Sequence, residues 1–145
     1  MFDLQEVVSE VVLPYQNMLS ERIRFRVVHE GENFRLEADP AKVKIAFRNL
    51  FINAVEAIRG RGEIEVRLVA QDGLLRLTVK DSGIGMDKDL LDKVFDPYFS
   101  TKDAGTGLGL PIARKIIEDH GGAIQAESAP GRGTKITITL PRKND

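Results

Sequence analysis

The sequence has no cysteine and only two histidines among its 145 residues. The lack of cysteine excludes disulfide scaffolds, cysteine-ligated zinc, iron–sulfur clusters and a thiol nucleophile. With two histidines, we expect no histidine-rich metal site. An excess of one charge is also missing, because 21 basic residues stand against 22 acidic ones, for a formal net charge of −1. This balance excludes a generally basic coat for nucleic acid and an acidic solvating tail.

Long hydrophobic runs are missing as well. The longest stretches without Asp, Glu, Lys or Arg, at 11–20 and 104–113, have ten residues each, whereas a membrane-spanning helix needs about twenty. The first residues are acidic and amphipathic and show no secretory signal. We therefore expect a cytoplasmic domain that contacts neither a membrane nor nucleic acid.

The composition that is present is typical of one globular domain. Hydrophobic residues make up 42% and charged residues 30%, and the length corresponds to a single domain. Apolar residues recur with helical spacing over about 3–19, 39–58 and 109–120. Asp3 and Asp39 occupy cap positions, and Pro14 is expected to kink or break the first helix.

Alternating apolar and polar residues predict strands over 23–29, 63–70, 74–80, 123–128 and 134–140. A short segment at 33–38, after a turn at Gly31, is expected to pair with the first of them. Asp72-Gly73 predicts a hairpin, and no regular element is predicted from 81 to about 106. Together these elements predict a two-layer α/β (α+β) sandwich, in which about three helices cover one face of a mixed, mostly antiparallel sheet.

Nine of the 13 glycines lie between residues 81 and 134, and glycine permits close approaches that other residues resist. Gly105, Gly107 and Gly109 lead directly into the last predicted helix. Free amides and the positive end of a helix dipole suit a phosphate chain there; ordinary turns are the alternative. A P-loop is excluded because no Gly-Lys-Ser/Thr ending is present. A dinucleotide-binding fold is disfavoured because the triplet does not follow a buried strand.

Polar side chains next to apolar segments mark two further candidate sites. Asn49, Asn53 and Glu56 lie within about 60° of one another on the helix at 39–58. Their oxygen atoms suit magnesium, which keeps waters and substrate phosphates in its shell; a solvated polar face is the alternative. Asp81 follows an apolar strand and precedes Ser-Gly-Ile-Gly. A carboxylate at this place can accept a hydrogen bond from a buried ligand amine, and an Asx-turn is the alternative.

Five segments occur in order along the chain: Asn49-x-x-x-Asn53-Ala-x-Glu56, Asp81-Ser-Gly-Ile-Gly-Met86, Phe95-Asp-Pro-Tyr-Phe-Ser-Thr-Lys102, Gly105-Thr-Gly-Leu-Gly-Leu110 and Gly131-Arg-Gly-Thr134. They resemble the asparagine, first glycine, phenylalanine, second glycine and third glycine boxes of the ATP-binding catalytic domain of two-component sensor histidine kinases. That domain belongs to the gyrase, Hsp90, histidine kinase and MutL superfamily, which has the Bergerat fold. The resemblance covers about 3–140, and the short segment between the glycine boxes is similar to the nitrogen-regulation and dicarboxylate-sensing branch.

The resemblance implies a site for ATP. Asp81 would bind the exocyclic amine of adenine, and Gly85 and Thr134 would complete that pocket. Amides around Gly107 and Gly109 would bind the phosphates. The full set of expected ATP-binding residues is Asn53, Asp81, Gly83, Gly85, Met86, Phe99, Thr101, Lys102, Gly105, Thr106, Gly107, Leu108, Gly109, Leu110 and Thr134.

The resemblance also implies a magnesium site on the helix. Asn53 would hold Mg²⁺ with Asn49 as a second ligand, and Glu56 would bind a magnesium-bound water. ATP-hydrolysing relatives such as gyrase place a glutamate at the position of Asn49, as the base for the attacking water. Because an amide is a poor general base, Asn49 favours phosphoryl transfer over hydrolysis.

A mobile ATP lid is expected over residues 86–106, anchored by Phe95 and Phe99. Many histidine kinases carry a lysine that helps to bind phosphate where this chain has Glu56. The expected phosphate-contacting cation is therefore Lys102, in the lid. With it, the expected catalytic residues are Asn49, Asn53, Glu56 and Lys102.

The resemblance makes residues 1–145 the catalytic and ATP-binding domain of an ATP-dependent protein-histidine kinase. The acceptor histidine would lie on a helical dimerisation domain absent from this chain, because neither His29 nor His120 is expected to be the acceptor. The partners would be that domain of the same protein and the receiver domain of a response regulator. This chain would be monomeric, and the intact protein, which is membrane-anchored in many relatives, would be a homodimer. The alternatives are an anti-sigma-factor-type serine kinase, a hydrolysing ATPase module and a degenerate nucleotide-binding or docking module.

Overall fold

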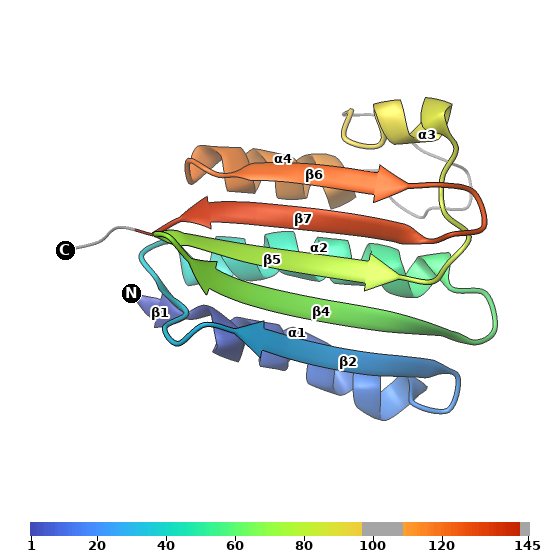
Figure 1. The fold of residues 1–145 in the computed structure, drawn as a ribbon, viewed down its shortest axis with the longest axis horizontal. Coiled ribbons are helices and arrows are strands. Elements are labelled where there is room, and N and C mark those ends of the chain that lie inside the picture. The colour runs from blue at the N-terminus through green and yellow to red at the C-terminus, as the bar shows by residue number, and fades with distance from the viewer. Residues whose placement is uncertain (97–108, 143–145) are drawn as a thin grey trace.

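The chain folds into two layers, a five-stranded sheet and the helices packed on one of its faces (Figure 1). The computed structural model describes residues 1–96 and 109–142. The helices on that face are α1 (Leu4–Leu19), α2 (Pro40–Ala57) and α4 (Gly109–Asp119). A short helix, α3 (Lys88–Lys93), lies beyond one edge of the sheet. The predicted two-layer sandwich is therefore confirmed.

The sheet is mixed and mostly antiparallel, as predicted. Its strands are β2 (Ile23–Glu30), β4 (Gly62–Gln71), β5 (Leu74–Asp81), β6 (Ala123–Ser128) and β7 (Thr134–Pro141). Their order is β2-β4-β5-β7-β6; β2 runs parallel to β4, and the other neighbours are antiparallel. Asp72 and Gly73 join β4 to β5 with φ angles of 55° and 77°. Positive φ at both turn residues is what a tight hairpin requires, so the predicted hairpin is confirmed.

Capping side chains fix where the first two long helices begin. The Asp3 carboxylate accepts a hydrogen bond from the backbone N–H of Gln5 at 2.9 Å, at the start of α1. The Asp39 carboxylate accepts from Ala41 and Lys42 at 3.0 and 3.3 Å, at the start of α2. Each carboxylate satisfies amides that have no partner within the helix, which confirms both predicted caps.

The predicted break in the first helix is wrong, because α1 continues through Pro14. Proline removes one backbone hydrogen bond and crowds the carbonyl four residues earlier, which belongs to Glu10. Both residues lie on the exposed side of the helix, where water can hydrate the freed carbonyl. The sequence also gives no sign of α3. None of its six residues is buried, so no apolar periodicity arises.

The segment at 33–38 does not pair with β2. Within it, β3 (Arg35–Leu36) pairs antiparallel with β1 (Phe2–Asp3) in a separate two-stranded sheet. This arrangement buries Phe34 and Leu36, which are 5% and 2% exposed. Burial of two large apolar side chains outweighs a local pairing that would leave them at the sheet edge.

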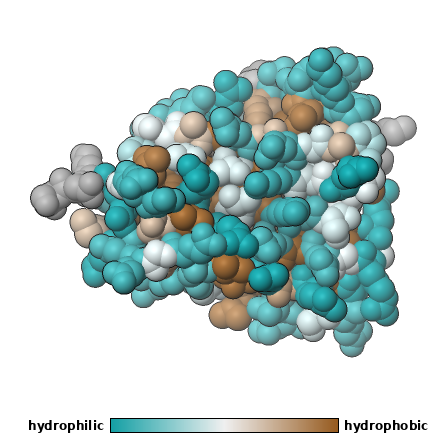
Figure 2. All heavy atoms as spheres, viewed as in Figure 1, coloured by the Kyte–Doolittle hydropathy of each residue, from teal (hydrophilic) through white to brown (hydrophobic). Residues whose placement is uncertain are grey.

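The core lies between the sheet and the helices. Phe51 of α2 is at its centre and packs against Tyr15, Phe25 and Phe47, with ring centroids 5.4, 5.9 and 6.0 Å apart. The opposite face of the sheet is mostly hydrophilic, with scattered hydrophobic residues (Figure 2). Within residues 1–96 and 109–142, no helix combines the length and the apolar composition needed to cross a membrane.

Candidate functional site

Asp81 is the one buried carboxylate in the described part of the chain. It is the last residue of β5 and is 4% exposed. The backbone N–H of Gly83 donates to its carboxyl group at 2.8 Å, and that of Thr134 is a second donor. Burial raises the pKa of the Asp81 carboxyl, and the two N–H donors partly offset this effect. Since no ion pair reaches it from the described residues, its charge is free for a ligand that donates hydrogen bonds.

The turn after Asp81 packs directly on the end of α2. A Cβ on Gly83 would lie 2.4 Å from the carbonyl oxygen of Ala57, so only glycine fits. The backbone N–H of Ile84 donates to the same oxygen at 3.0 Å. The turn that follows the buried carboxylate is thus joined to the helix that carries the polar face.

The first and third glycine segments also touch backbone to backbone. Gly85 has φ +72°, and a Cβ there would lie 2.0 Å from the carbonyl oxygen of Ala129. Gly133 has φ +80°, and a Cβ there would lie 1.9 Å from the carbonyl oxygen of Asp81. Both positions need glycine for conformation and for space. Segments about fifty residues apart therefore form one wall around Asp81.

Three of the predicted site residues other than glycine lie at this wall, namely Asp81, Met86 and Thr134. Asp81 and Thr134 are register partners in β5 and β7. The backbone N–H of Met86 and the hydroxyl of Thr134 both contact the hydroxyl of Ser128, at 2.8 and 2.9 Å. Sequence reasoning missed Ser128. The sequence does contain a signal for it. Ile124, Ala126 and Ser128 occupy alternate, inward-facing positions of β6, and Ser128 is the polar one among them.

The polar face of α2 holds the other predicted side chains. Asn49 and Asn53 are half-buried, and Glu56 is exposed. Gly109 begins α4 beside this face, because a Cβ on it would lie 3.7 Å from the Cβ of Asn49. Leu110 is 5% exposed and belongs to the core, so it can offer a ligand only its backbone.

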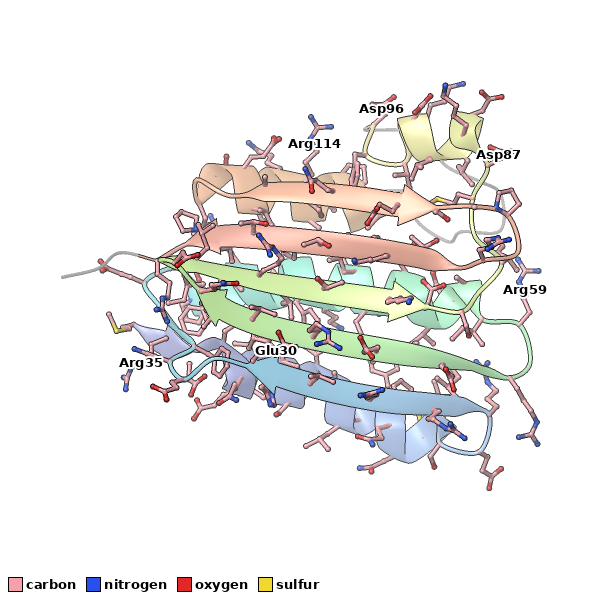
Figure 3. The ribbon with its side chains drawn as sticks, in the orientation of Figure 1. Glu30, Arg35, Arg59, Asp87, Asp96 and Arg114 are labelled. Carbon is pink, nitrogen blue, oxygen red and sulfur yellow. The ribbon has the colours of Figure 1, made fainter. Side chains whose placement is uncertain are left out.

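Several predictions fall on residues that the structure does not describe. They are Phe99, Thr101, Lys102, Gly105, Thr106, Gly107 and Leu108. Of the predicted lid, residues 86–96 are described. They include α3 and Phe95, which is partly buried against the core. Figure 3 places Arg59 and Asp87 at the same end of the sheet, where β5 reaches Asp81.

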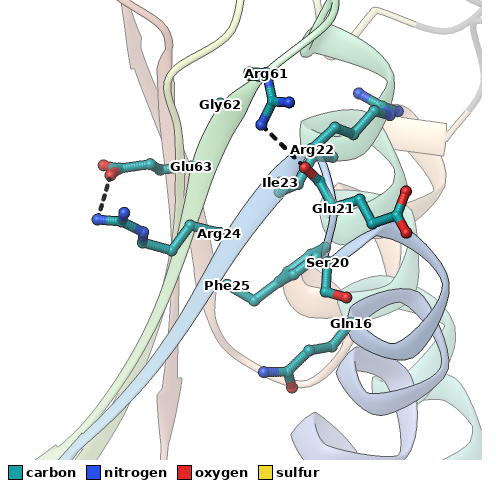
Figure 4. A pocket seen from close by; sticks show the side chains of 10 residues that line it. All are labelled: Gln16, Ser20, Glu21, Arg22, Ile23, Arg24, Phe25, Arg61, Gly62 and Glu63. Carbon is teal, nitrogen blue, oxygen red and sulfur yellow. Dashed lines mark hydrogen bonds and ion pairs between the residues drawn. The ribbon is translucent and has the colours of Figure 1, made fainter.

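A separate hollow lies between the end of α1 and the starts of β2 and β4 (Figure 4). Its arginine side chains and Glu63 already have partners. Arg24 pairs with Glu63 at 3.4 Å, and Arg61 donates to the carbonyl of Glu21 at 3.1 Å. No lining residue is a buried charge. The Asp81 site is therefore the stronger candidate.

Comparison with known proteins identifies the class to which this fold and site belong. The sequence profile of the histidine kinase-, DNA gyrase B- and HSP90-like ATPases matches residues 38–144. The chain belongs to this ATPase family. The fold is that of a histidine kinase catalytic domain, because the catalytic domain of histidine kinase ThkA superposes with a TM-score of 0.88 at 36% identity. That superposition covers 97% of this chain and 93% of that one.

Two further relatives are full sensor proteins or complexes. Sensor histidine kinase ZraS of Klebsiella oxytoca is 43% identical over 141 residues, covering 96% of this chain and 30% of its own length. Histidine kinase ThkA in complex with response regulator TrrA superposes with a TM-score of 0.83 at 33% identity, covering 98% of this chain and 41% of that one. The chain thus spans less than a third of the curated relative.

Proposed function

We propose that residues 1–145 form the catalytic and ATP-binding domain of a sensor histidine kinase. The domain binds Mg-ATP and donates the γ-phosphate to a histidine on a partner helical dimerisation domain. The phosphorylated kinase then signals to a response regulator. The observation that carries the proposal is the buried Asp81 carboxylate. It is held by two backbone N–H groups where the first and third glycine segments meet.

Asp81 and its surroundings fit the amine of adenine. An ionised carboxylate only accepts hydrogen bonds, and this one is buried without a cation among the described residues. A ligand amine would supply the missing donor, whereas a carbonyl in the same place would meet negative charge. Gly83, Gly85 and Met86 would line this pocket with backbone, and Thr134 would face it with its hydroxyl.

The polar face of α2 fits magnesium. Asn53 would hold the ion with Asn49 as a second ligand, and Glu56 would bind one of its waters. No group of three His, Asp or Glu residues that could hold a metal exists in the described ranges, so waters and phosphate oxygens would complete the shell. Bound magnesium would neutralise phosphate charge.

The phosphates would lie at the start of α4. Gly109 begins this helix beside Asn49, and helix N-terminal amides bind anions. We propose the remaining phosphate contacts from Gly105, Thr106, Gly107 and Leu108. Thr101, Phe99 and Lys102 would complete the site within a lid at 86–106, with Lys102 reaching the γ-phosphate.

The side chain of Asn49 supports transfer rather than hydrolysis. Its amide cannot take a proton from an attacking water, and phosphoryl transfer itself depends on positioning and charge neutralisation. We propose the acceptor-bearing dimerisation domain of the same protein and a receiver domain as partners, in a cytoplasmic homodimer of the short-lid, nitrogen-regulation-like branch. The complex of ThkA with a response regulator supports the second partner.

Phosphotransfer tests the proposal. The chain is mixed with a helical dimerisation domain that carries an acceptor histidine and with γ-labelled ATP; Asp81→Asn serves as the control. We expect label on the acceptor in an acid-labile, alkali-stable linkage, as a phosphohistidine requires. An acid-stable linkage would indicate a serine kinase, and sustained phosphate release without acceptor would indicate a hydrolase. ATP binding with no transfer would indicate a docking module.

A further inference from the structure

The hydroxyl of Ser128 lies where the two glycine segments meet. Its oxygen is 2.8 Å from the backbone nitrogen of Met86, 2.8 Å from the carbonyl oxygen of Gly133 and 2.9 Å from the hydroxyl oxygen of Thr134. Ser128 closes β6 and Thr134 opens β7. One small side chain therefore contacts the first glycine segment once and the third glycine segment twice.

Hydrogen counting fixes the direction of each of these bonds. A carbonyl oxygen only accepts, so the single hydroxyl hydrogen of Ser128 is donated to Gly133. The N–H of Met86 only donates, so Ser128 accepts from it. Ser128 then has no hydrogen left for Thr134, and the hydroxyl of Thr134 must be the donor in the remaining bond. Ser128 has one donation and two acceptances, which is the full capacity of a hydroxyl.

This direction determines what Thr134 can offer a ligand. Its hydroxyl hydrogen is committed to Ser128, so the oxygen can only accept further hydrogen bonds. Its backbone N–H is donated to the neighbouring Asp81 carboxyl, which is also an acceptor. The side chains of Asp81 and Thr134, which are 4% and 5% exposed, are therefore both acceptors. A ligand that binds next to them must supply hydrogen-bond donors.

We propose that Ser128 is a positioning residue that sets base specificity: it holds the Thr134 hydroxyl as an acceptor, so the pocket selects a purine with an amino group over one with a carbonyl at position 6. This inference rests on the proposed ATP site. An amino group supplies two hydrogens to two acceptors, whereas a carbonyl supplies none. Without Ser128, the Thr134 hydroxyl can rotate and donate to a carbonyl, so discrimination falls.

The test is the ratio of ATP to ITP affinity, measured by calorimetry in magnesium. ITP carries a carbonyl in place of the 6-amino group of ATP, and a hydrogen on the adjacent N1. Ser128→Ala is expected to lower the ratio about 2- to 10-fold, which is the range that the loss of one neutral hydrogen bond gives. A purely structural role for Ser128 would weaken both nucleotides equally and leave the ratio unchanged.

Two more variants make the result decisive. Ser128→Cys leaves no cavity but replaces the hydroxyl with a slightly larger thiol, which is a weak donor and a weak acceptor, so the ratio should fall in the same direction even if Ser128→Ala does not fold. Thr137→Val removes a β7 hydroxyl that contacts Thr78 at 3.3 Å on the open face, and the ratio should stay at the wild-type value. An unchanged ratio in both Ser128 variants would overturn the inference. A wild-type chain that binds ATP no better than ITP would instead contradict the proposed adenine site.

Discussion

The carbonyl oxygen of Ala57, at the end of α2, accepts a hydrogen bond from the backbone N–H of Ile84 at 3.0 Å. Ala57 ends the helix that carries the predicted magnesium ligands, and Ile84 lies in the turn after Asp81. Gly83 allows this contact, because a Cβ there would lie 2.4 Å from the same carbonyl. The proposed base and metal sites are thus joined by backbone, so their spacing does not depend on flexible side chains.

Replacement of the buried Asp81 carboxylate is expected to weaken ATP binding without lowering the stability of the free domain. Asp81→Asn should weaken ATP binding about 10- to 100-fold, because it removes a charged acceptor and presents an N–H to the ligand amine. The melting temperature of the free domain should not fall, since burial of the charge is unfavourable. Calorimetry and thermal melting measure the two effects. A variant with wild-type ATP affinity would refute the adenine assignment.

The raised pKa of Asp81 predicts a pH dependence with a definite sign. Because the folded pKa lies above the unfolded one, the folded state retains a proton between the two values. The free energy of unfolding should therefore fall as pH rises through this window. Asp81→Asn lacks the titration, so its stability advantage over wild type should be small in acid and grow toward neutral pH. Chemical denaturation across pH measures this difference, and a constant difference would contradict it.

The close approach at Gly85 can be separated from its backbone conformation. Gly85→Ala adds a Cβ 2.0 Å from the carbonyl oxygen of Ala129, at φ +72°. Gly131→Ala is the matched control, because φ is +74° and no atom lies within 4 Å. The control should lose about 1–2 kcal/mol from the left-handed conformation alone. Gly85→Ala should lose more in urea unfolding and should also weaken ATP binding; equal losses would mean that the contact is unimportant.

The metal assignment predicts a loss that depends on magnesium. Asn53→Ala should remove most of the gain in ATP affinity that magnesium gives, about tenfold or more, and should leave metal-free binding little changed. Asn17→Ala removes an exposed amide from α1 and serves as the control. Titrations with ATP, with and without magnesium, decide the point. If Asn53→Ala weakened binding equally in both conditions, Asn53 would not be a ligand.

Local signals in the sequence predicted much of the fold. Asp72-Gly73, the cap at Asp39 and the alternation of β5 and β7 depend on neighbouring residues, and each was predictable. The pairing of β3 with β1 depends on the burial of Phe34 by distant elements, and no local pattern encodes it.

The same distinction holds for the candidate site. Asp81 was found from its place after an apolar strand, next to glycines. The clustering of those glycines was visible, but their contacts were not, because the approach of Gly85 to Ala129 exists only after β5 and β6 take their places. Ser128 was missed because its role depends on the tertiary neighbours of one hydroxyl.

The central claim is tested most directly by titration of the purified chain with ATP, with and without magnesium. GTP is the comparison nucleotide, and phosphate release is monitored in the same samples. The account predicts saturable binding that magnesium strengthens, a clear preference for ATP over GTP, and negligible phosphate release. Equal affinity for the two nucleotides, or no binding in magnesium, would contradict an adenine site built on Asp81. Sustained phosphate release would contradict a domain that reserves the γ-phosphate for a histidine.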